Sequence, residues 1–283
     1  MNLLVQSDSF SAELGTVMEL VGQYNWLNKG KDAILVMNCN YDSLLDSNII
    51  NITKGYIPVG SIDFSERVLK LTTGVPHMAP LLVPEELKPF ARRKTEICSS
   101  KEEILHLFDE WKQPELFIKS ASVLKGDYTD IYTKEQIESL PEDELYFVSE
   151  IVNIVSEWRA FVFNGKILDV KNYDGDYWQM PDKNIVERMV YEYSYESDYL
   201  KRTEKNGENP PAYTLDVAVI EKDNVLENAV VEVHNFVSCG FYGFDHPLIP
   251  QMLKKGWEWE KQRAANFKVN KTGFCDTDDN ACH

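Results

Sequence analysis

The stretch FVSEIVNIVSEWRAFVFNGKILDVKNY, residues 147–173, places four ionisable groups among strand-forming apolar residues. These groups are Glu150, Glu157, Arg159 and Lys171. An ionised side chain that is buried without a partner costs several kcal/mol, so apolar strands rarely carry one without a reason. Either these groups are exposed or ion-paired strand residues, or they line a site for a charged ligand.

The Asn-Gly pair at 164–165 divides this stretch into two strands, because Asn-Gly is the strongest short signal for a β-hairpin. Side chains alternate across a sheet, so Glu157, Arg159 and Phe161 are predicted to share one face. The face of Lys171 depends on the loop. A strict two-residue turn puts Lys171 on the face opposite Arg159, whereas a three-residue loop with a glycine bulge puts both on one face.

Two further carboxylates lie in apolar runs nearer the C-terminus, Asp216 in TLDVAV and Glu232 in VVEVHN. If these runs are buried strands, both carboxylates need a positive partner. Arg159 or Lys171 can supply it through salt bridges. Mg²⁺ can also supply it, since this ion prefers one or two carboxylates together with phosphate oxygens.

A lysine and a small-residue loop precede these strands, in ELFIKSASVLKGDYTD. Lys119 is placed at a strand end, and Lys125 with Gly126 in the loop that follows. Such a loop can bring backbone N–H groups and an ammonium group close to phosphate. Taken alone, a lysine at a strand end is more often simply solvated.

Composition restricts the classes of partner. The chain has 283 residues and a net charge of −17, so its surface is expected to repel nucleic-acid backbones. The start has no basic leader, and no apolar run approaches the ~18 residues of a membrane span. Five scattered cysteines indicate reduced thiols rather than a disulfide framework. We therefore expect a cytoplasmic protein without nucleic-acid or membrane partners.

The order of these features resembles the ATP-grasp superfamily, in particular its clade in which a late arginine is replaced by lysine. The similarity covers about residues 92–260, and VSEIVNIVSEWRAFV and LDVAVIE…VVEVHNFVSCGFYGF are its most specific parts. It implies an α/β (α+β) fold with two lobes that clasp ATP, preceded by a small α/β domain. The implied division is 1–90 for the N-terminal domain, 91–148 for the small lobe, 149–265 for the C-terminal lobe with the metal site, and 266–283 for an acidic tail.

The resemblance also implies residue roles. It places ATP against these residues: Lys94, Lys119, Lys125, Gly126, Glu150, Ile151, Val152 and Glu157. Arg159 and Lys171 would be the catalytic cations, with Arg159 on the γ-phosphate or the reacting carboxylate and Lys171 at the arginine-to-lysine position. Asp216 and Glu232 would hold Mg²⁺.

One position departs from the family pattern. The family usually has asparagine two residues after the metal-binding glutamate, and here that residue is His234, followed by Asn235. Oxygen ligands suit Mg²⁺ better than imidazole does. Either Asn235 takes over as a ligand through a local bulge, or the second metal site is weakened.

The resemblance implies an ADP-forming carboxylate–amine ligase that uses ATP and Mg²⁺ to make an amide through an acylphosphate. Its substrates would be a carboxylate, from a peptide, a protein or a small acid, and an amine. The alternatives are an ATP-dependent phosphotransferase and a non-catalytic nucleotide-binding interaction protein. The sequence leaves the oligomeric state open, including a homo-oligomer.

Overall fold

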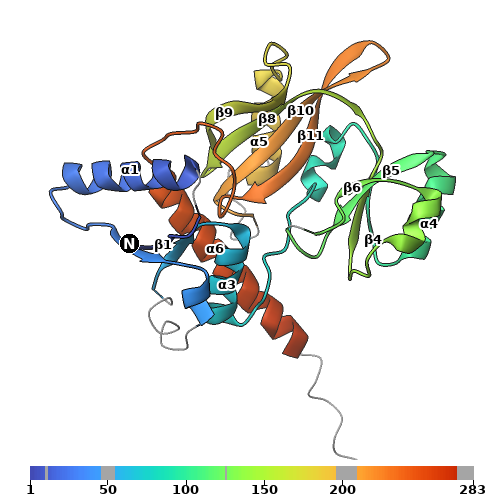
Figure 1. The fold of residues 1–283 in the computed structure, drawn as a ribbon. Helices are drawn as coiled ribbons and strands as arrows, with labels where there is room; N and C mark the ends of the chain where they lie inside the picture. The colour runs from blue at the N-terminus through green and yellow to red at the C-terminus, as the bar shows by residue number, and fades with distance from the viewer. Residues whose placement is uncertain (10–11, 46–54, 125, 196–208, 273–283) are drawn as a thin grey trace, which may run out of the picture. The chain divides into compact units, whose positions relative to one another are not determined.

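The computed structural model describes residues 1–9, 12–45, 55–124, 126–195 and 209–272. The chain divides into two compact units, residues 1–78 with the segment that begins at Pro247, and residues 79–246. Figure 1 labels most of the helices and strands of both units. The first boundary follows Met78, whereas the resemblance implies one after residue 90.

The first unit is a three-stranded parallel sheet, in the order β2-β1-β3, with helices packed against it. Its elements are β1 (Asn2–Gln6), α1 (Ala12–Leu27), β2 (Leu35–Cys39), η1 (Asp42–Leu45), β3 (Ile57–Val59), α3 (Ile62–Thr73) and α6 (Ile249–Thr272). The sequence predicts this α/β unit, since NLLVQ and AILVMNCN read as strands on either side of a helix. Leu3 and Leu4 are fully buried in its core.

Helix α6 clusters with this first unit, whereas the sequence assigns residues up to 265 to the C-terminal lobe. The helix contacts α1, α3 and β3, and Trp257 is buried with 1% exposure. An apolar helical face of this kind gains most by covering a sheet that lacks a partner. The helix also continues to Thr272, past the predicted start of the tail at 266. Residues 273–283 lie outside the described residues.

The second unit begins with a four-stranded antiparallel sheet in the order β4-β7-β5-β6. This part contains η2 (Glu85–Phe90), β4 (Thr95–Cys98), α4 (Lys101–Trp111), β5 (Glu115–Ser120), β6 (Asp130–Thr133), η3 (Lys134–Ser139) and β7 (Tyr146–Ser149). The sequence predicts Ser99 or Ser100 as the cap of α4, and the hydroxyl of Ser100 accepts a hydrogen bond from the backbone N–H of Glu103 at 3.3 Å.

The second sheet of this unit is also four-stranded and antiparallel, in the order β11-β10-β8-β9. Its elements are β8 (Asn153–Phe163), β9 (Lys166–Gly175), α5 (Lys183–Ser194), β10 (Ala212–Lys222) and β11 (Val225–Asn235). Helix α5 covers one face, where Met189 and Val190 pack in one cluster with Ala160, Leu215 and Val217. The opposite face is the one that carries the ionisable residues.

The β8–β9 hairpin closes with the predicted two-residue turn. Asn164 and Gly165 adopt positive φ values of 49° and 68°, as a type I′ turn requires. The register then shifts within β9, so that Arg159 pairs directly with Lys171. Both residues therefore share a face. The two-residue loop alone would put them on opposite faces, but the register shift adds one residue within β9 and reverses that result.

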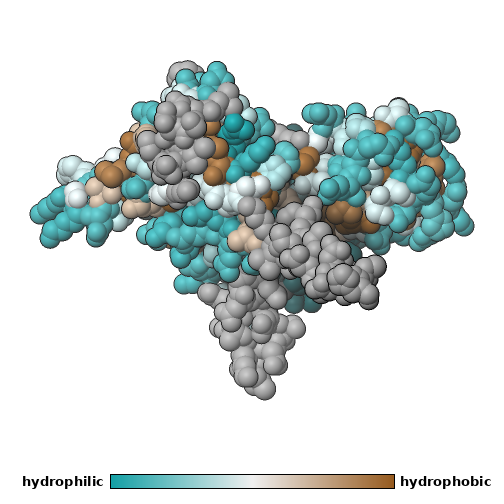
Figure 2. Space-filling model, turned by 90° about the horizontal axis from the view of Figure 1, so that it is seen from below, coloured by the Kyte–Doolittle hydropathy of each residue, from teal (hydrophilic) through white to brown (hydrophobic). Residues whose placement is uncertain are grey.

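The described surface is mainly hydrophilic on the face that Figure 2 shows, as the net charge of −17 leads one to expect. Apolar residues occur there in small separate patches. Among the described residues, the helices are all too short or too polar to cross a membrane.

Candidate functional site

Three neighbouring strands present their ionisable side chains on one face of the second sheet. Arg159 on β8 is the cross-strand partner of Asp216 on β10, and Asp216 is in turn the partner of Glu232 on β11. Directly paired residues of an antiparallel sheet point to the same side. By the same alternation Glu157 and His234 belong to this face. The register thus brings together five of the residues that the sequence singles out.

Arg159 and Asp216 form a buried bidentate ion pair. Nε and Nη2 of Arg159 donate to the two carboxylate oxygens of Asp216, each at 2.7 Å. Burial by itself would lower the pKa of Arg159, but the hydrogen bonds and the charge of Asp216 outweigh burial and raise this pKa. The rings of Tyr173 and Tyr242, which stack on each other, lie 5.5 and 5.1 Å from the guanidinium carbon, so the cation also lies beside two aromatic rings.

Glu232 connects two basic side chains, Lys119 and His234. Its Oε2 accepts a short hydrogen bond from Lys119 of β5, and its Oε1 lies 2.6 Å from Nε2 of His234. Burial by itself would raise the pKa of Glu232, but the charges of His234 and Lys119 hold it well below its usual range. The carboxylate is therefore ionised, and it joins the two sheets of the second unit through Lys119.

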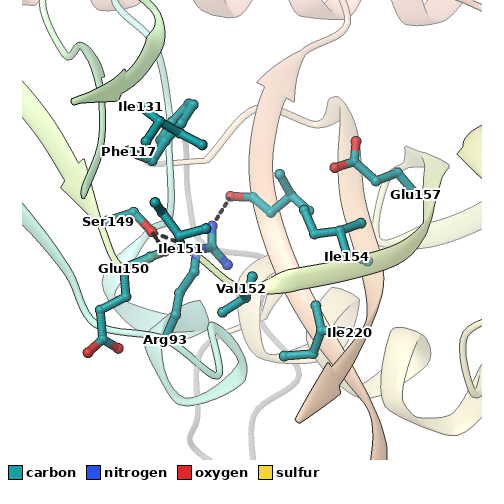
Figure 3. A pocket seen from close by; sticks show the side chains of 12 residues that line it. Arg93, Phe117, Ile131, Ser149, Glu150, Ile151, Val152, Ile154, Glu157 and Ile220 are labelled. Atoms are coloured by element: carbon teal, nitrogen blue, oxygen red, sulfur yellow. Dashed lines mark hydrogen bonds between the residues drawn. The ribbon is translucent and has the colours of Figure 1, made fainter. Parts of the chain in front are cut away.

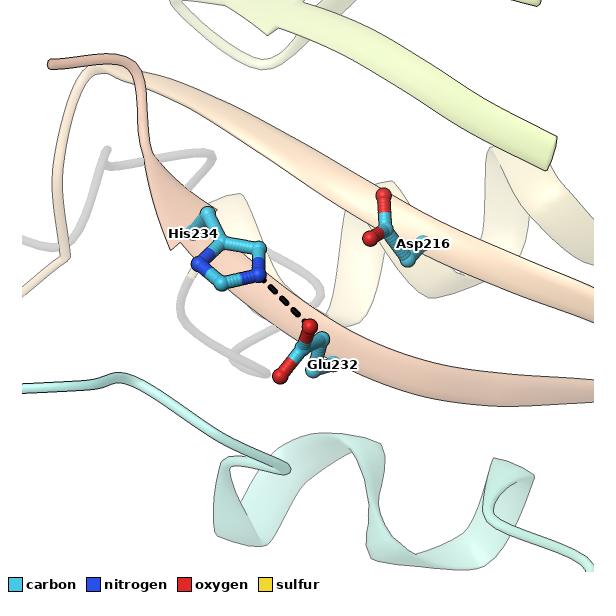
Figure 4. Close-up of side chains that lie close together, drawn as sticks. All are labelled: Asp216, Glu232 and His234. Carbon is cyan, nitrogen blue, oxygen red and sulfur yellow. Dashed lines mark hydrogen bonds and ion pairs between the residues drawn. The ribbon is translucent and has the colours of Figure 1, made fainter. Parts of the chain in front are cut away.

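Asp216, Glu232 and His234 form a cluster of potential metal ligands (Figure 4). One donor atom from each lies within 4.8 Å of the others. Both oxygens of Asp216 accept from Arg159, yet an ionised carboxylate offers about four lone-pair sites and can bind a cation as well. The hydroxyl of Thr214, fully buried on the same face, has no hydrogen-bond partner among the described residues. This donor set fits a divalent cation.

Asn235 does not take the place of His234 in this cluster. It pairs with Tyr213, one position beyond the pair of His234 with Thr214. The irregularity of β11 lies at Val231, before Glu232 rather than after it. Alternation therefore turns Asn235 to the other face. The sequence leaves open whether Asn235 replaces His234 through a local bulge. The structure has no bulge between Glu232 and Asn235 that would exchange the two residues.

A mostly apolar cavity of about 250 Å³ lies between the two sheets of the second unit (Figure 3). It is lined by Arg93, Phe117, Ile131, Ser149, Glu150, Ile151, Val152, Ile154, Glu157, Ala218, Ile220 and Val231. The segment 150–152 connects β7 to β8 and forms one wall. The mostly apolar lining of the cavity suits a flat aromatic ring.

Arg93 lines this cavity, and sequence reasoning assigned it no role. Its Nε donates to the hydroxyl of Ser149 at 2.8 Å, and its Nη1 and Nη2 donate to the carbonyl oxygens of Val230 at 2.6 Å and Val231 at 3.1 Å. Burial lowers the pKa of Arg93, against the charges of nearby carboxylates. The sequence gives no signal for it, because Arg92, Arg93 and Lys94 are three basic residues in a row ahead of β4.

Lys94 is more exposed, with a side chain 55% accessible. Its ammonium group lies 3.9 Å from Glu150 and 5.8 Å from the ring centre of Trp111. The carboxylate of Glu150 accepts from the backbone N–H of Lys94 at 2.8 Å and in Figure 3 turns away from the cavity. The predicted contacts of Lys94 and Glu150 with ATP stay predictions. Because its carboxylate turns away from the cavity, Glu150 would contact a ligand there through its backbone.

Glu157 lies where the cavity meets the ionisable face. Burial raises the pKa of Glu157 above its ordinary value, and the negative charges of Asp216, Asp174 and Glu232 add to this effect. A hydrogen bond from Tyr173 acts in the opposite direction. A carboxylate in the position of Glu157 can accept hydrogen bonds from hydroxyl groups of a ligand in the cavity.

Lys171 and Gly126 are the remaining predicted residues that the structure describes. Lys171 faces the same side as Arg159 and pairs with Asp169 at 2.8 Å. Gly126 packs so closely that a Cβ atom there would lie 2.7 Å from Cβ of Ser120. Lys125 lies outside the described residues.

Residues 90–252 match the sequence model of an ATP-grasp domain family, the second family of the arginine-to-lysine clade. The match spans more than half of the chain. The chain belongs to the ATP-grasp superfamily. The fold agrees with this assignment, because mixed α/β architecture with antiparallel sheets is also that of solved ATP-grasp proteins that it resembles.

One similar solved structure is the D-cycloserine synthetase DcsG, with a TM-score of 0.54 and 11% identity over 93% of this chain and 100% of that one. A RimK domain ATP-grasp protein from Sphaerobacter thermophilus has a TM-score of 0.48 and 11% identity over 95% and 100% of the two chains. The D-alanine–D-alanine ligase from Bacillus anthracis has a TM-score of 0.47 and 14% identity over 93% and 99%. No functionally curated protein matches this ATP-grasp chain in sequence.

Proposed function

We propose that this ATP-grasp protein is an ATP- and Mg²⁺-dependent carboxylate–amine ligase that releases ADP. One observation carries the proposal. An apolar cavity continues into a face where two carboxylates suited to a metal, Asp216 and Glu232, are each paired with a cation suited to phosphate, Arg159 and Lys119. A site for a metal–nucleotide complex needs both kinds of charge side by side.

The nucleotide would lie with its base in the cavity, between apolar side chains of the two sheets. Ile151 and Val152 supply the backbone of the connecting segment along the edge of the base. Glu157, at the end of the cavity, would accept hydrogen bonds from the ribose hydroxyls. Lys119 would then reach the phosphates, because its ammonium group already lies at the ionisable face.

Asp216, Glu232 and His234 would hold the divalent cation, which when bound would neutralise charge on the phosphate oxygens. Arg159 is held rigidly by Asp216 and the two tyrosine rings, so it would need little reorganisation to stabilise the charge of the transferring phosphoryl group. Lys171, paired across the strands with Arg159, adds a second cation on the same side.

The proposed reaction has two steps. An oxygen of the substrate carboxylate attacks the γ-phosphorus of ATP, which gives an acylphosphate and ADP. The nitrogen of an amine then attacks the acyl carbon and expels inorganic phosphate, and loss of a proton from nitrogen completes the amide. Neither step needs a serine or cysteine nucleophile. The described cysteines, Cys39, Cys98 and Cys239, form no disulfide with one another.

Thermal unfolding with and without Mg·ATP, in the wild type and in Glu232→Gln, tests the nucleotide site. A ligand at a hundred times its Kd adds about 2.7 kcal/mol of stability. We expect a Mg²⁺-dependent increase of Tm in the wild type that the variant loses. No increase at saturating Mg·ATP would contradict the proposal.

A second measurement tests the reaction class. With hydroxylamine present, a panel of carboxylate substrates should yield a hydroxamate and ADP in equal amounts from the one that is accepted. ADP with a phosphorylated hydroxyl product would indicate a phosphotransferase instead. Binding of ATP without ADP formation for any substrate in the panel would indicate a nucleotide-binding protein that is not a ligase.

A further inference from the structure

His234 contributes a nitrogen atom to the metal cluster. Its Nε2 lies 2.6 Å from Oε1 of Glu232, and both belong to the group of donor atoms that lie within 4.8 Å of one another. The other carboxylate oxygen of Glu232 is the one that accepts from Lys119. Glu232 thus turns one oxygen toward the phosphate-binding lysine and the other toward the imidazole. A cation that takes the place of the hydrogen bond between Oε1 and Nε2 would share Glu232 with Lys119.

An imidazole ligand changes which metal a site favours. Mg²⁺ takes oxygen ligands in strict octahedral geometry and loses its water reluctantly. Most first-row transition ions, such as Fe²⁺, Ni²⁺, Cu²⁺ and Zn²⁺, accept imidazole nitrogen readily together with carboxylate oxygen, and Mn²⁺, which prefers oxygen, is the most stringent probe among them. A cluster of two carboxylates and one imidazole therefore favours the transition ions more than a cluster of oxygen donors alone would.

We propose that His234 is a direct metal ligand and that it makes this site select a first-row transition ion, for which Mn²⁺ is the probe, over Mg²⁺. The proposal concerns the cluster of the proposed function. It does not depend on which reaction the protein catalyses.

The hydroxyl of Thr214 supplies an independent reason to expect a ligand here. Thr214 is fully buried, and its Oγ1 has no hydrogen-bond partner among the described residues. It is the cross-strand partner of His234 and lies two residues before Asp216 on the same strand, so it shares their face. Buried hydroxyl groups are almost always paired. A ligand of this cluster, or water that a bound cation holds, would give Thr214 its partner.

The decisive experiment detects the metal–nitrogen bond directly. Mn²⁺ is added to the full chain, and electron spin echo envelope modulation is recorded. We expect ¹⁴N modulation from a coordinated imidazole in the wild type and its loss in His234→Asn, which removes the imidazole and leaves a shorter amide side chain. His106→Asn, an exposed histidine of α4 with a side chain 76% accessible, should keep the signal.

A competition titration measures the selectivity. The ratio of the Mg²⁺ and Mn²⁺ dissociation constants should fall by more than about tenfold in His234→Asn, because loss of even an outer partner of a metal site costs 10–100-fold. Thr214→Val, nearly isosteric, should weaken Mn²⁺ binding by about tenfold and keep the ¹⁴N signal. Circular dichroism of each variant shows whether it is folded.

Mn²⁺ bound without ¹⁴N modulation in the wild type, or an unchanged ratio in folded His234→Asn, overturns the proposal, as does the absence of Mn²⁺ binding. If acylphosphate formation occurs with Mg²⁺ while the nitrogen signal is missing, the proposed function stands and this inference fails. If the nitrogen signal is present while Mg·ATP and Mn·ATP leave Tm unchanged, the inference stands and the proposed function fails.

Discussion

Arg159 and Asp216 bind each other across β8 and β10 through two parallel hydrogen bonds of 2.7 Å. Their side chains are only 8% and 2% exposed, so water cannot replace either partner. The pair fixes the register of two central strands at the point where the site is built. It also places the guanidinium group of Arg159 next to Tyr173 and Tyr242.

Loss of one partner of this pair should be more harmful than loss of both. Arg159→Met or Asp216→Leu alone leaves a buried charge unpaired, which costs about 3–5 kcal/mol of unfolding free energy. The double variant leaves no unpaired charge and should be more stable than the sum of the single effects indicates. Denaturant unfolding of the four proteins measures this coupling. If the losses of unfolding free energy in the two single variants add up in the double variant, the two charges do not stabilise each other.

The contact of Lys119 with Glu232 should affect metal and nucleotide in opposite directions. Lys119→Met removes a cation that competes for the carboxylate, so metal binding in the absence of nucleotide should tighten. It also removes a phosphate partner, so ATP binding should weaken. A charged hydrogen bond of about 1.5–3 kcal/mol corresponds to a change of about tenfold or more in each constant. Isothermal titration calorimetry measures both.

Lys134→Met is the matched control for Lys119. Lys134 also pairs with a carboxylate, Asp109 at 2.5 Å, but both side chains are largely exposed, at 44% and 70%. Exposed pairs contribute about 0–1 kcal/mol, and this one lies outside the proposed site. Both binding constants should stay unchanged in this variant. If Lys119→Met changed the affinities for metal and for ATP in the same direction, Lys119 would not be a competitor of the metal that also binds phosphate.

Arg93 and its neighbour Lys94 should differ in their effect on ATP binding. Arg93→Met removes a guanidinium group from the cavity wall and leaves the carbonyl groups of Val230 and Val231 without this donor. We expect weaker ATP binding and a loss of about 3 kcal/mol of stability, from buried acceptors at about 1–3 kcal/mol each. Lys94→Met should change both quantities little. Fluorescence titration with an ATP analogue and denaturant unfolding compare the two variants.

Weaker ATP binding in Lys94→Met, with little change in Arg93→Met, would instead support the prediction made from sequence that Lys94 contacts ATP. Arg92→Met controls for the loss of a positive charge in this segment. Arg92 is exposed and lies 3.4 Å from Glu227 at the surface, so its removal should cost less than about 1 kcal/mol.

The sequence predicts the ionisable face better than it predicts the cavity wall. Arg159, Asp216 and Glu232 stand out because charged residues interrupt apolar strands, and strand alternation is enough to put them on one side. Arg93 gives no such signal, because three basic residues in a row do not reveal which of them turns inward. That choice depends on the acceptors that β7 and β11 provide, which are more than 50 residues away in sequence.

Two other features depend on details that the sequence pattern does not contain. The face of Lys171 is decided by a bulge inside β9, whereas the turn alone would give the opposite result. The place of α6 is decided by which sheet lacks a cover. Trp257 marks an apolar face of that helix, but the face fits either unit as far as the sequence is concerned.

Glu157 should reduce stability at neutral pH while it supports ATP binding. Burial raises the pKa of Glu157 in the folded protein. At a pH just above the ordinary carboxyl pKa, the folded protein therefore still holds a proton that the unfolded chain has lost. Stability therefore falls as pH rises through that window. In Glu157→Gln, the gain in unfolding free energy over wild type should grow from near zero in acid to a plateau at neutral pH, while ATP affinity decreases. Denaturant unfolding across pH, with exposed Glu96→Gln as control, measures this. A gain that is independent of pH would contradict it.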